Sequence, residues 1–328
     1  MDTLTNLTDA LNARQNEYRY LVLDPLKKVA SWDPLHADML RNSHGSDALR
    51  RILRPDLAWS PEHCPILLLL ASPGGSLDED LVRSSETYAF GEALYEKRYV
   101  CGWLNSALSP DEMAVWLADL CKHIKPGVSI PAFEPLRLEL LQATADPELL
   151  AGLLAATTQW HWMSCTGELR TLSGKSGGDA WMLNWGAEHA QAEVRNIWRL
   201  LSAWHESNDA LPPEAVRLAA DAWFAADKSG LHHLSDRLWG SVCEPGTYNV
   251  IHRFQLADGE PAELQQVWSF LCLYMKGEPV PAEPKNKGRP DSWRPRKADK
   301  WPEEWEREST TAPDGSTPVI RFRETLPE

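Results

Sequence analysis

Residues 64–71 read Cys-Pro-Ile-Leu-Leu-Leu-Leu-Ala, an unbroken apolar run that stops at a Ser-Pro-Gly-Gly turn at residues 72–75. An apolar run of this length, bounded by proline and glycine, predicts a β-strand that is buried on both faces. Residues 18–23 read Tyr-Arg-Tyr-Leu-Val-Leu, and residues 99–104 read Tyr-Val-Cys-Gly-Trp-Leu. Both stretches are rich in aromatic and aliphatic residues, so we expect two further strands there.

Stretches with helical periodicity lie between these strands. Residues 3–15 and 77–97 carry apolar residues at helical spacing, and Ser109 begins a third helix because Pro110 and Glu112 follow it as in a capping box. Shorter helices are expected at residues 34–41, 47–53 and 133–141 and from residue 147 onward. Buried strands that alternate with helices predict an α/β lobe over residues 1–150, with a small, largely parallel or mixed sheet.

The pattern changes after residue 150. Residues 159–172 and 180–185 are expected to pair as a hairpin, joined by a glycine-rich connector at residues 173–178. Amphipathic helices are expected at residues 188–206, 213–228, 231–239 and 261–275. We therefore expect a connecting hairpin and a mainly α-helical lobe over residues 151–276, followed by a proline-rich, disordered tail over residues 277–328.

Composition limits the classes of partner. The 328 residues carry a net charge of −14, which argues against nucleic acid and anionic membranes because both require a basic face. The longest apolar run is far shorter than the ~20 residues of a membrane helix, and the N-terminus lacks a signal-peptide pattern. The six cysteines are scattered, so we expect a cytoplasmic protein without disulfides. The 16 tryptophans favour a protein-binding surface.

No motif in the chain predicts an enzyme, a metal site or a cofactor. The sequence Ser-Gly-Lys-Ser at residues 173–176 resembles part of a phosphate-binding loop, but Leu169 stands where the loop needs its first glycine. His161 and Cys165 lack the paired spacing of a zinc site. No nucleophile elbow or metalloprotease motif is present in the sequence, so we expect a protein that is not an enzyme.

The first half of the chain resembles a known family through the order of its motifs. Residues 20–24 read Tyr-Leu-Val-Leu-Asp, residues 64–69 form the proline-led strand, and residues 99–106 end in Asn-Ser after the third strand. A helix at residues 113–120 follows, and then Phe-Glu-Pro-Leu-Arg at residues 133–137, where the family more often has Tyr-Asp-Pro. This order, from Tyr20 to Leu141, resembles the adaptor or chaperone family of bacterial type VI secretion systems, which is defined by domain of unknown function 4123.

The resemblance implies a function and a set of partners. Such adaptors are not enzymes. They bind the N-terminal region of a secreted effector and the C-terminal region of the VgrG spike protein, and they load the effector before secretion. By resemblance we expect a structural or interface cluster at Asp24, Phe133, Glu134, Pro135 and Arg137. Contact residues are also expected at four tryptophans, namely Trp160, Trp162, Trp181 and Trp185. The alternative is an immunity protein that binds and neutralises a cognate toxin.

Overall fold

The computed structural model describes residues 6–125, 127–175, 183–207 and 210–228. The chain divides into two compact units, one that ends at Trp198 and one that begins at Arg199. The helices expected at residues 231–239 and 261–275 and the tail expected at residues 277–328 lie outside the described residues.

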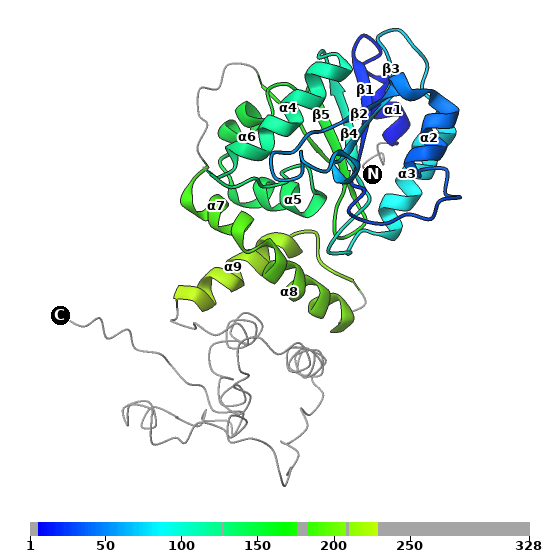
Figure 1. Cartoon of the computed structure of the whole chain (residues 1–328). Coiled ribbons are helices and arrows are strands. Elements are labelled where there is room, and N and C mark those ends of the chain that lie inside the picture. Colours follow the sequence, from blue (N-terminus) through cyan, green and yellow to red (C-terminus); the bar gives the residue numbers. More distant parts are fainter. Residues whose placement is uncertain (1–5, 126, 176–182, 208–209, 229–328) are drawn as a thin grey trace, which may run out of the picture. The chain divides into compact units, whose positions relative to one another are not determined.

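A six-stranded sheet with the strand order β2-β3-β1-β4-β5-β6 organises the first unit (Figure 1). The strands are β1 (Tyr18–Leu23), β2 (Leu49–Arg51), β3 (Ile66–Ala71), β4 (Val100–Ser106), β5 (Gln159–Met163) and β6 (Leu169–Leu172). The expected α/β lobe followed by helices is confirmed. The expected parallel or mixed pairing is wrong, because every neighbouring pair is antiparallel. A continuous apolar strand reports burial on both faces, and burial alone does not determine the direction of the strand.

Helices cover both faces of this sheet (Figure 1). The helices that lie wholly within the first unit are α1 (Leu7–Asn12), α2 (Ala37–His44), α3 (Glu79–Gly91), α4 (Pro110–His123), α5 (Pro135–Thr144), α6 (Pro147–Leu153) and α7 (Trp185–Ala192), with the short 3₁₀ helices η1 (Ser46–Ala48) and η2 (Pro61–His63). Tyr20 and Val22 pack with α4, α5 and α6, whereas Leu21 and Leu23 pack with α1, α2 and α3. Alternate side chains of β1 therefore serve two separate cores, because successive residues of a strand point to opposite faces.

Strand β4 departs from this alternation at Gly102. Cys101 and Leu104 belong to the core under α4, whereas Trp103 belongs to the core under α3. The pairing of β1 with β4 shifts register between Val22 and Leu23, and Gly102 has a φ of 140°. Such a φ favours glycine, and a bulge that inserts one residue reverses which face the following side chains occupy.

Two local predictions differ from the structure. Residues 159–172 form two strands that pair with each other, because Ser164 to Glu168 make a tight turn in which Gly167 has a φ of 77°. The helix expected at residues 47–53 is instead η1 followed by β2, whose residues pair with β3. In both places hydrogen bonding to a neighbouring strand prevails over the local pattern.

The first unit extends beyond the expected boundary at residue 150. Strand β5 pairs with β4, with His161 opposite Trp103 and Trp160 opposite Leu104. This pairing joins the hairpin of β5 and β6 to the sheet. Helix α8 (Val194–Ser207) begins in the first unit and ends in the second, where α9 (Ala215–Lys228) follows it. Ala215, Ala219 and Trp223 are buried at spacings of four residues, so they form one apolar face of α9.

Candidate functional site

One edge of the sheet brings Asp24 close to the start of α5. Strands β1 and β5 are both antiparallel to β4, so both end at the edge where β4 begins. Asp24 directly follows β1, and its backbone N–H donates to the carbonyl of Tyr99, one residue before β4, at 2.7 Å. The negative charge of Glu134 helps to raise the pKa of Asp24, so Glu134, at the start of α5, lies near this edge.

The Asp24 side chain is buried and only partly hydrogen-bonded. Its Oδ1 accepts the backbone N–H of Leu26 at 3.0 Å, while Oδ2 is buried with no hydrogen-bond partner among the described residues. Burial raises the pKa of this carboxyl from 3.8 to about 6, and the negative charge of Glu134 acts in the same direction. The hydrogen bond from Leu26 and the charges of Lys97 and Arg54 oppose that rise.

Glu134 and Arg137 form the charged start of α5. Pro135 occupies the first helical position, and the Glu134 side chain makes no capping hydrogen bond to the helix. Its carboxylate instead pairs with Lys97, and its Oε2 accepts a hydrogen bond from Nε of Arg137 at 2.8 Å. This arrangement holds Glu134 between two cations in a partly buried position.

Arg137 also connects α5 to α7. Its Nη1 donates to the carbonyl of Gln191 at 2.7 Å, and Nε2 of Gln191 donates back to the carbonyl of Arg137 at 3.0 Å. Gln191 is buried, so these bonds satisfy polar groups that water does not reach. Arg137 therefore has a structural task that is sufficient to account for its presence.

Phe133 lies in the core immediately before this charged helix start. Its ring is fully buried, and the Arg54 guanidinium lies 5.8 Å from the ring centroid. Arg54 is also one of the charges that act on Asp24, and it forms an ion pair with Asp56 at 2.6 Å. The five residues expected from the resemblance therefore belong to one neighbourhood, in which Phe133 supplies packing, Pro135 begins α5, and Asp24, Glu134 and Arg137 supply charge.

Sequence reasoning missed a second charged pair at the same edge. Arg98 and Glu139 are both buried and lie 3.7 Å apart. Nη1 of Arg98 donates to the carbonyl of Met163 at 2.7 Å, and Oε1 of Glu139 accepts the backbone N–H of Cys165 at 2.8 Å. Burial raises the pKa of Glu139 to about 7, and the charge of Arg98 limits that rise. The available signal was a lone carboxylate within the apolar run of residues 138–141.

A cavity of about 170 Å³ opens beside this neighbourhood. Its lining includes four cationic side chains and two carboxylates, contributed by Lys97, Arg98, Arg137, Arg195, Glu96 and Glu134. Trp198 also lines it and donates its indole N–H to the carbonyl of Leu94 at 2.9 Å. The cavity therefore combines an apolar wall with convergent charges, which is the usual composition of a binding pocket.

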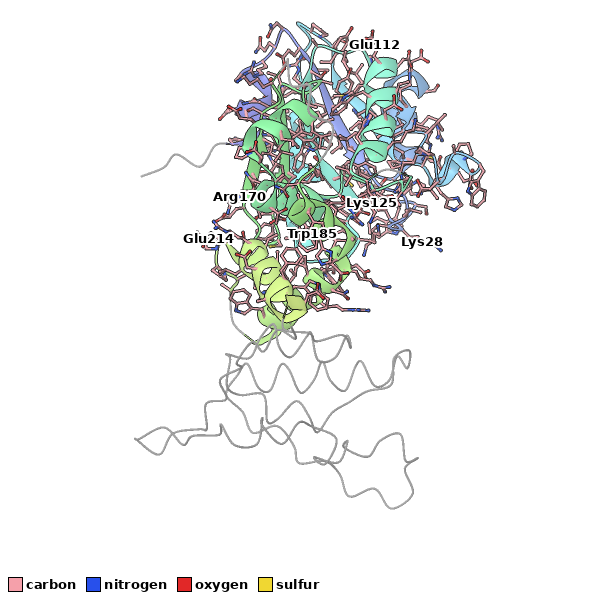
Figure 2. All side chains as sticks on the ribbon, turned by 90° about the vertical axis from the view of Figure 1, so that its left-hand side faces the viewer. Lys28, Glu112, Lys125, Arg170, Trp185 and Glu214 are labelled. Carbon is pink, nitrogen blue, oxygen red and sulfur yellow. The ribbon has the colours of Figure 1, made fainter. Side chains whose placement is uncertain are left out.

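The four tryptophans expected to contact partners have different surroundings. Trp160 and Trp162 are fully buried in the core under α4, so they offer no accessible surface. Trp185 lies on α7 (Figure 2). Its side chain is 69% exposed and stacks on His189, with the ring centroids 5.0 Å apart. Trp181 lies outside the described residues. Periodicity could not separate these positions, because tryptophan suits both a core and an interface.

Two backbone N–H groups of the glycine-rich connector, those of Gly174 and Lys175, donate to carbonyls of the first unit. The N–H of Gly174 donates to Thr157 at 3.1 Å, and the N–H of Lys175 donates to Ala151 at 2.8 Å. Among the described residues no group of three or more histidine, cysteine or acidic side chains could hold a metal ion. No helix in the described ranges is both long and apolar enough to cross a membrane.

Comparison with known proteins adds one finding. A family of unknown function, DUF6708, matches residues 218–293. The match begins inside α9 and continues past the boundary that we expected at residue 277, and it does not include the edge of the sheet described above. No curated protein and no solved structure matches the chain.

Proposed function

We propose that the chain is a non-enzymatic adaptor that binds a type VI secretion effector and helps to load it onto the VgrG spike. The proposal rests on the resemblance of residues 20–141 to such adaptors. The observation that carries it is the meeting of two motifs that lie more than a hundred residues apart in the sequence. Asp24 at the end of β1 and residues 133–137 at the start of α5 lie in one neighbourhood.

Exposed aromatic side chains support a binding role. Trp32, Trp59 and Trp185 are 79%, 82% and 69% exposed, and each would bury a large apolar area against a partner. Large aromatic side chains are enriched at protein interfaces because they bury much surface at little cost in conformational entropy. Among these three, Trp185 was expected from the sequence as a contact residue, and it lies on α7, which Arg137 connects to α5.

The test is a pull-down from the native cell lysate with the full chain as bait and mass spectrometry as the readout. The adaptor function predicts that a protein with a toxin domain is recovered together with a VgrG protein. The N-terminal segment of that toxin, produced separately, should then bind the chain without its toxic domain. Trp185→Ser should weaken that binding about tenfold or more if the tryptophan contacts the effector.

Val115→Ser is the control, because Val115 is an apolar residue of similar exposure, 63%, on α4 and is not among the aromatic side chains that support the binding role. Recovery of a small toxin whose activity falls on binding would replace the adaptor function with immunity. Failure to recover either a toxin or a spike protein would reject both functions.

A further inference from the structure

The start of α5 leaves hydrogen-bond donors without acceptors at the cavity. Pro135 has no N–H, and the Glu134 side chain does not cap the helix. The backbone N–H groups of Leu136 and Arg137 have no acceptor among the described residues. Both residues line the cavity, and the partial positive charge of a helix N-terminus acts at this position.

A buried guanidinium provides an independent observation at the same cavity. The side chain of Arg98 is only 4% exposed, and it lines the cavity. Its Nη1 and Nη2 are used by Met163 and Glu139, but its Nε is buried with no hydrogen-bond partner in the described part of the chain. A buried charged donor without an acceptor is costly, and a bound acceptor would remove that cost.

The neighbouring carboxylates limit the charge of the ligand. Glu134 pairs with Lys97 and Arg137, and Glu96 pairs with Arg195 at 2.9 Å. Both carboxylates line the cavity, so they would repel a dianion such as phosphate more strongly than a monoanion. A carboxylate has one negative charge and two oxygens that could accept from Nε of Arg98 and from the helix N–H groups.

We propose that this cavity is a binding site for a single carboxylate group, held by Arg98 and the first N–H groups of α5. The site stands independently of the adaptor function, because it rests on unpartnered donors rather than on the resemblance. The carboxylate comes either from a small molecule or from the end or an acidic side chain of a polypeptide.

The test measures the binding of trifluoroacetate to the full chain by ¹⁹F NMR line broadening, with displacement by acetate and by inorganic phosphate. We expect saturable binding that acetate displaces at lower concentration than phosphate. Arg98→Lys keeps the positive charge but removes the Nε donor, and it should weaken binding about tenfold. Arg83→Lys is the control and should leave binding unchanged, because Arg83 is exposed on α3 and pairs with Asp80.

A second variant guards against misfolding of Arg98→Lys. Glu134→Gln removes a negative charge from the cavity wall, so it should strengthen binding several-fold. Line broadening that does not saturate, or affinities that are equal in the wild type and in Glu134→Gln, would overturn the proposal. A short peptide with a free C-terminal carboxylate and its amidated form then distinguish the sources. Tighter binding of the free peptide than of acetate assigns the site to a polypeptide, and binding of acetate alone assigns it to a small molecule.

Discussion

Two buried carboxyl groups, Asp24 and Glu139, titrate near neutral pH at the same edge of the sheet. Burial raises the pKa of Asp24 to about 6 and that of Glu139 to about 7. The charges of Lys97 and Arg98 limit these rises but do not cancel them, because desolvation is the larger effect. The stability of this edge should therefore depend on pH in a range where exposed carboxyl groups are already ionised.

Replacing Glu139 with glutamine should remove part of this pH dependence. A carboxyl whose folded-state pKa is raised stabilises the fold fully below its unfolded pKa, here 4.5, and this stabilisation is lost as pH rises through about 7. From pH 5 to pH 8, Glu139→Gln should gain roughly 2–3 kcal/mol in the free energy of unfolding relative to the wild type. Urea unfolding at both pH values measures the difference. The exposed carboxylate of Glu168 provides the control variant Glu168→Gln, and equal pH profiles for Glu139→Gln and the wild type would contradict the expectation.

Replacing Arg137 with alanine should destabilise the junction of α5 and α7. The change removes the donor to the buried Gln191 carbonyl and one of the two cations that pair with Glu134. Leaving buried acceptors unpaired should cost about 1–3 kcal/mol in the free energy of unfolding. Arg83→Ala removes an exposed ion pair and should cost less than about 1 kcal/mol. Equal losses in the two variants, measured by chemical unfolding, would show that Arg137 has no special structural role.

Strand β4 depends strongly on a single residue, Gly102. The bulge at Gly102 allows Cys101 and Trp103 to enter opposite cores although they lie two residues apart. It also lets the β4 backbone approach β5 closely, because a Cβ at Gly102 would lie 2.5 Å from the carbonyl oxygen of His161.

Gly102→Ala should therefore be strongly destabilising. The side chain would clash with the backbone carbonyl oxygen of His161 and with the indole of Trp160, and a φ of 140° is rarely adopted by residues other than glycine. We expect a loss of at least about 2 kcal/mol. Gly91→Ala is the matched control, because a Cβ there meets no atom within 4 Å and the residue ends α3. Thermal unfolding of both variants tests this, and a Gly102→Ala protein as stable as Gly91→Ala would contradict the bulge geometry.

The first unit consists of one sheet between two helical layers (Figure 1). Strands β1 and β4 have hydrogen-bonded partners on both sides, and most of their residues are buried. Strands β2 and β6 are the outermost strands of the sheet, each with one neighbouring strand, and all seven of their residues are partly or fully accessible to solvent. The second unit is described only through the end of α8 and α9.

Amide hydrogen exchange should follow this order of strands. The N–H groups of β1 and β4 should exchange slowest, because they open only when the sheet unfolds, and those of β2 and β6 should exchange fastest among the strands. Exchange measured by mass spectrometry on the full chain resolves these segments. Equal protection of β2 and β1 would contradict the observed strand order.

Local pattern alone determined several elements of this protein correctly. Strands β1, β3 and β4 lie where the apolar runs predicted them, because strong β-propensity and flanking proline or glycine act within a few residues. Helix α4 begins at Pro110 after the Ser109 capping box, as its sequence indicated.

How these elements meet depends on contacts between residues that lie far apart in the chain. The tertiary structure made the sheet antiparallel, joined β5 and β6 to β4, and paired Arg98 with Glu139 across the edge of the sheet. It also buried Trp160 while leaving Trp185 exposed. The physical reason is that periodicity reports how many faces of an element are buried. Which neighbour buries them depends on contacts between residues far apart in the chain, and no local pattern encodes those contacts.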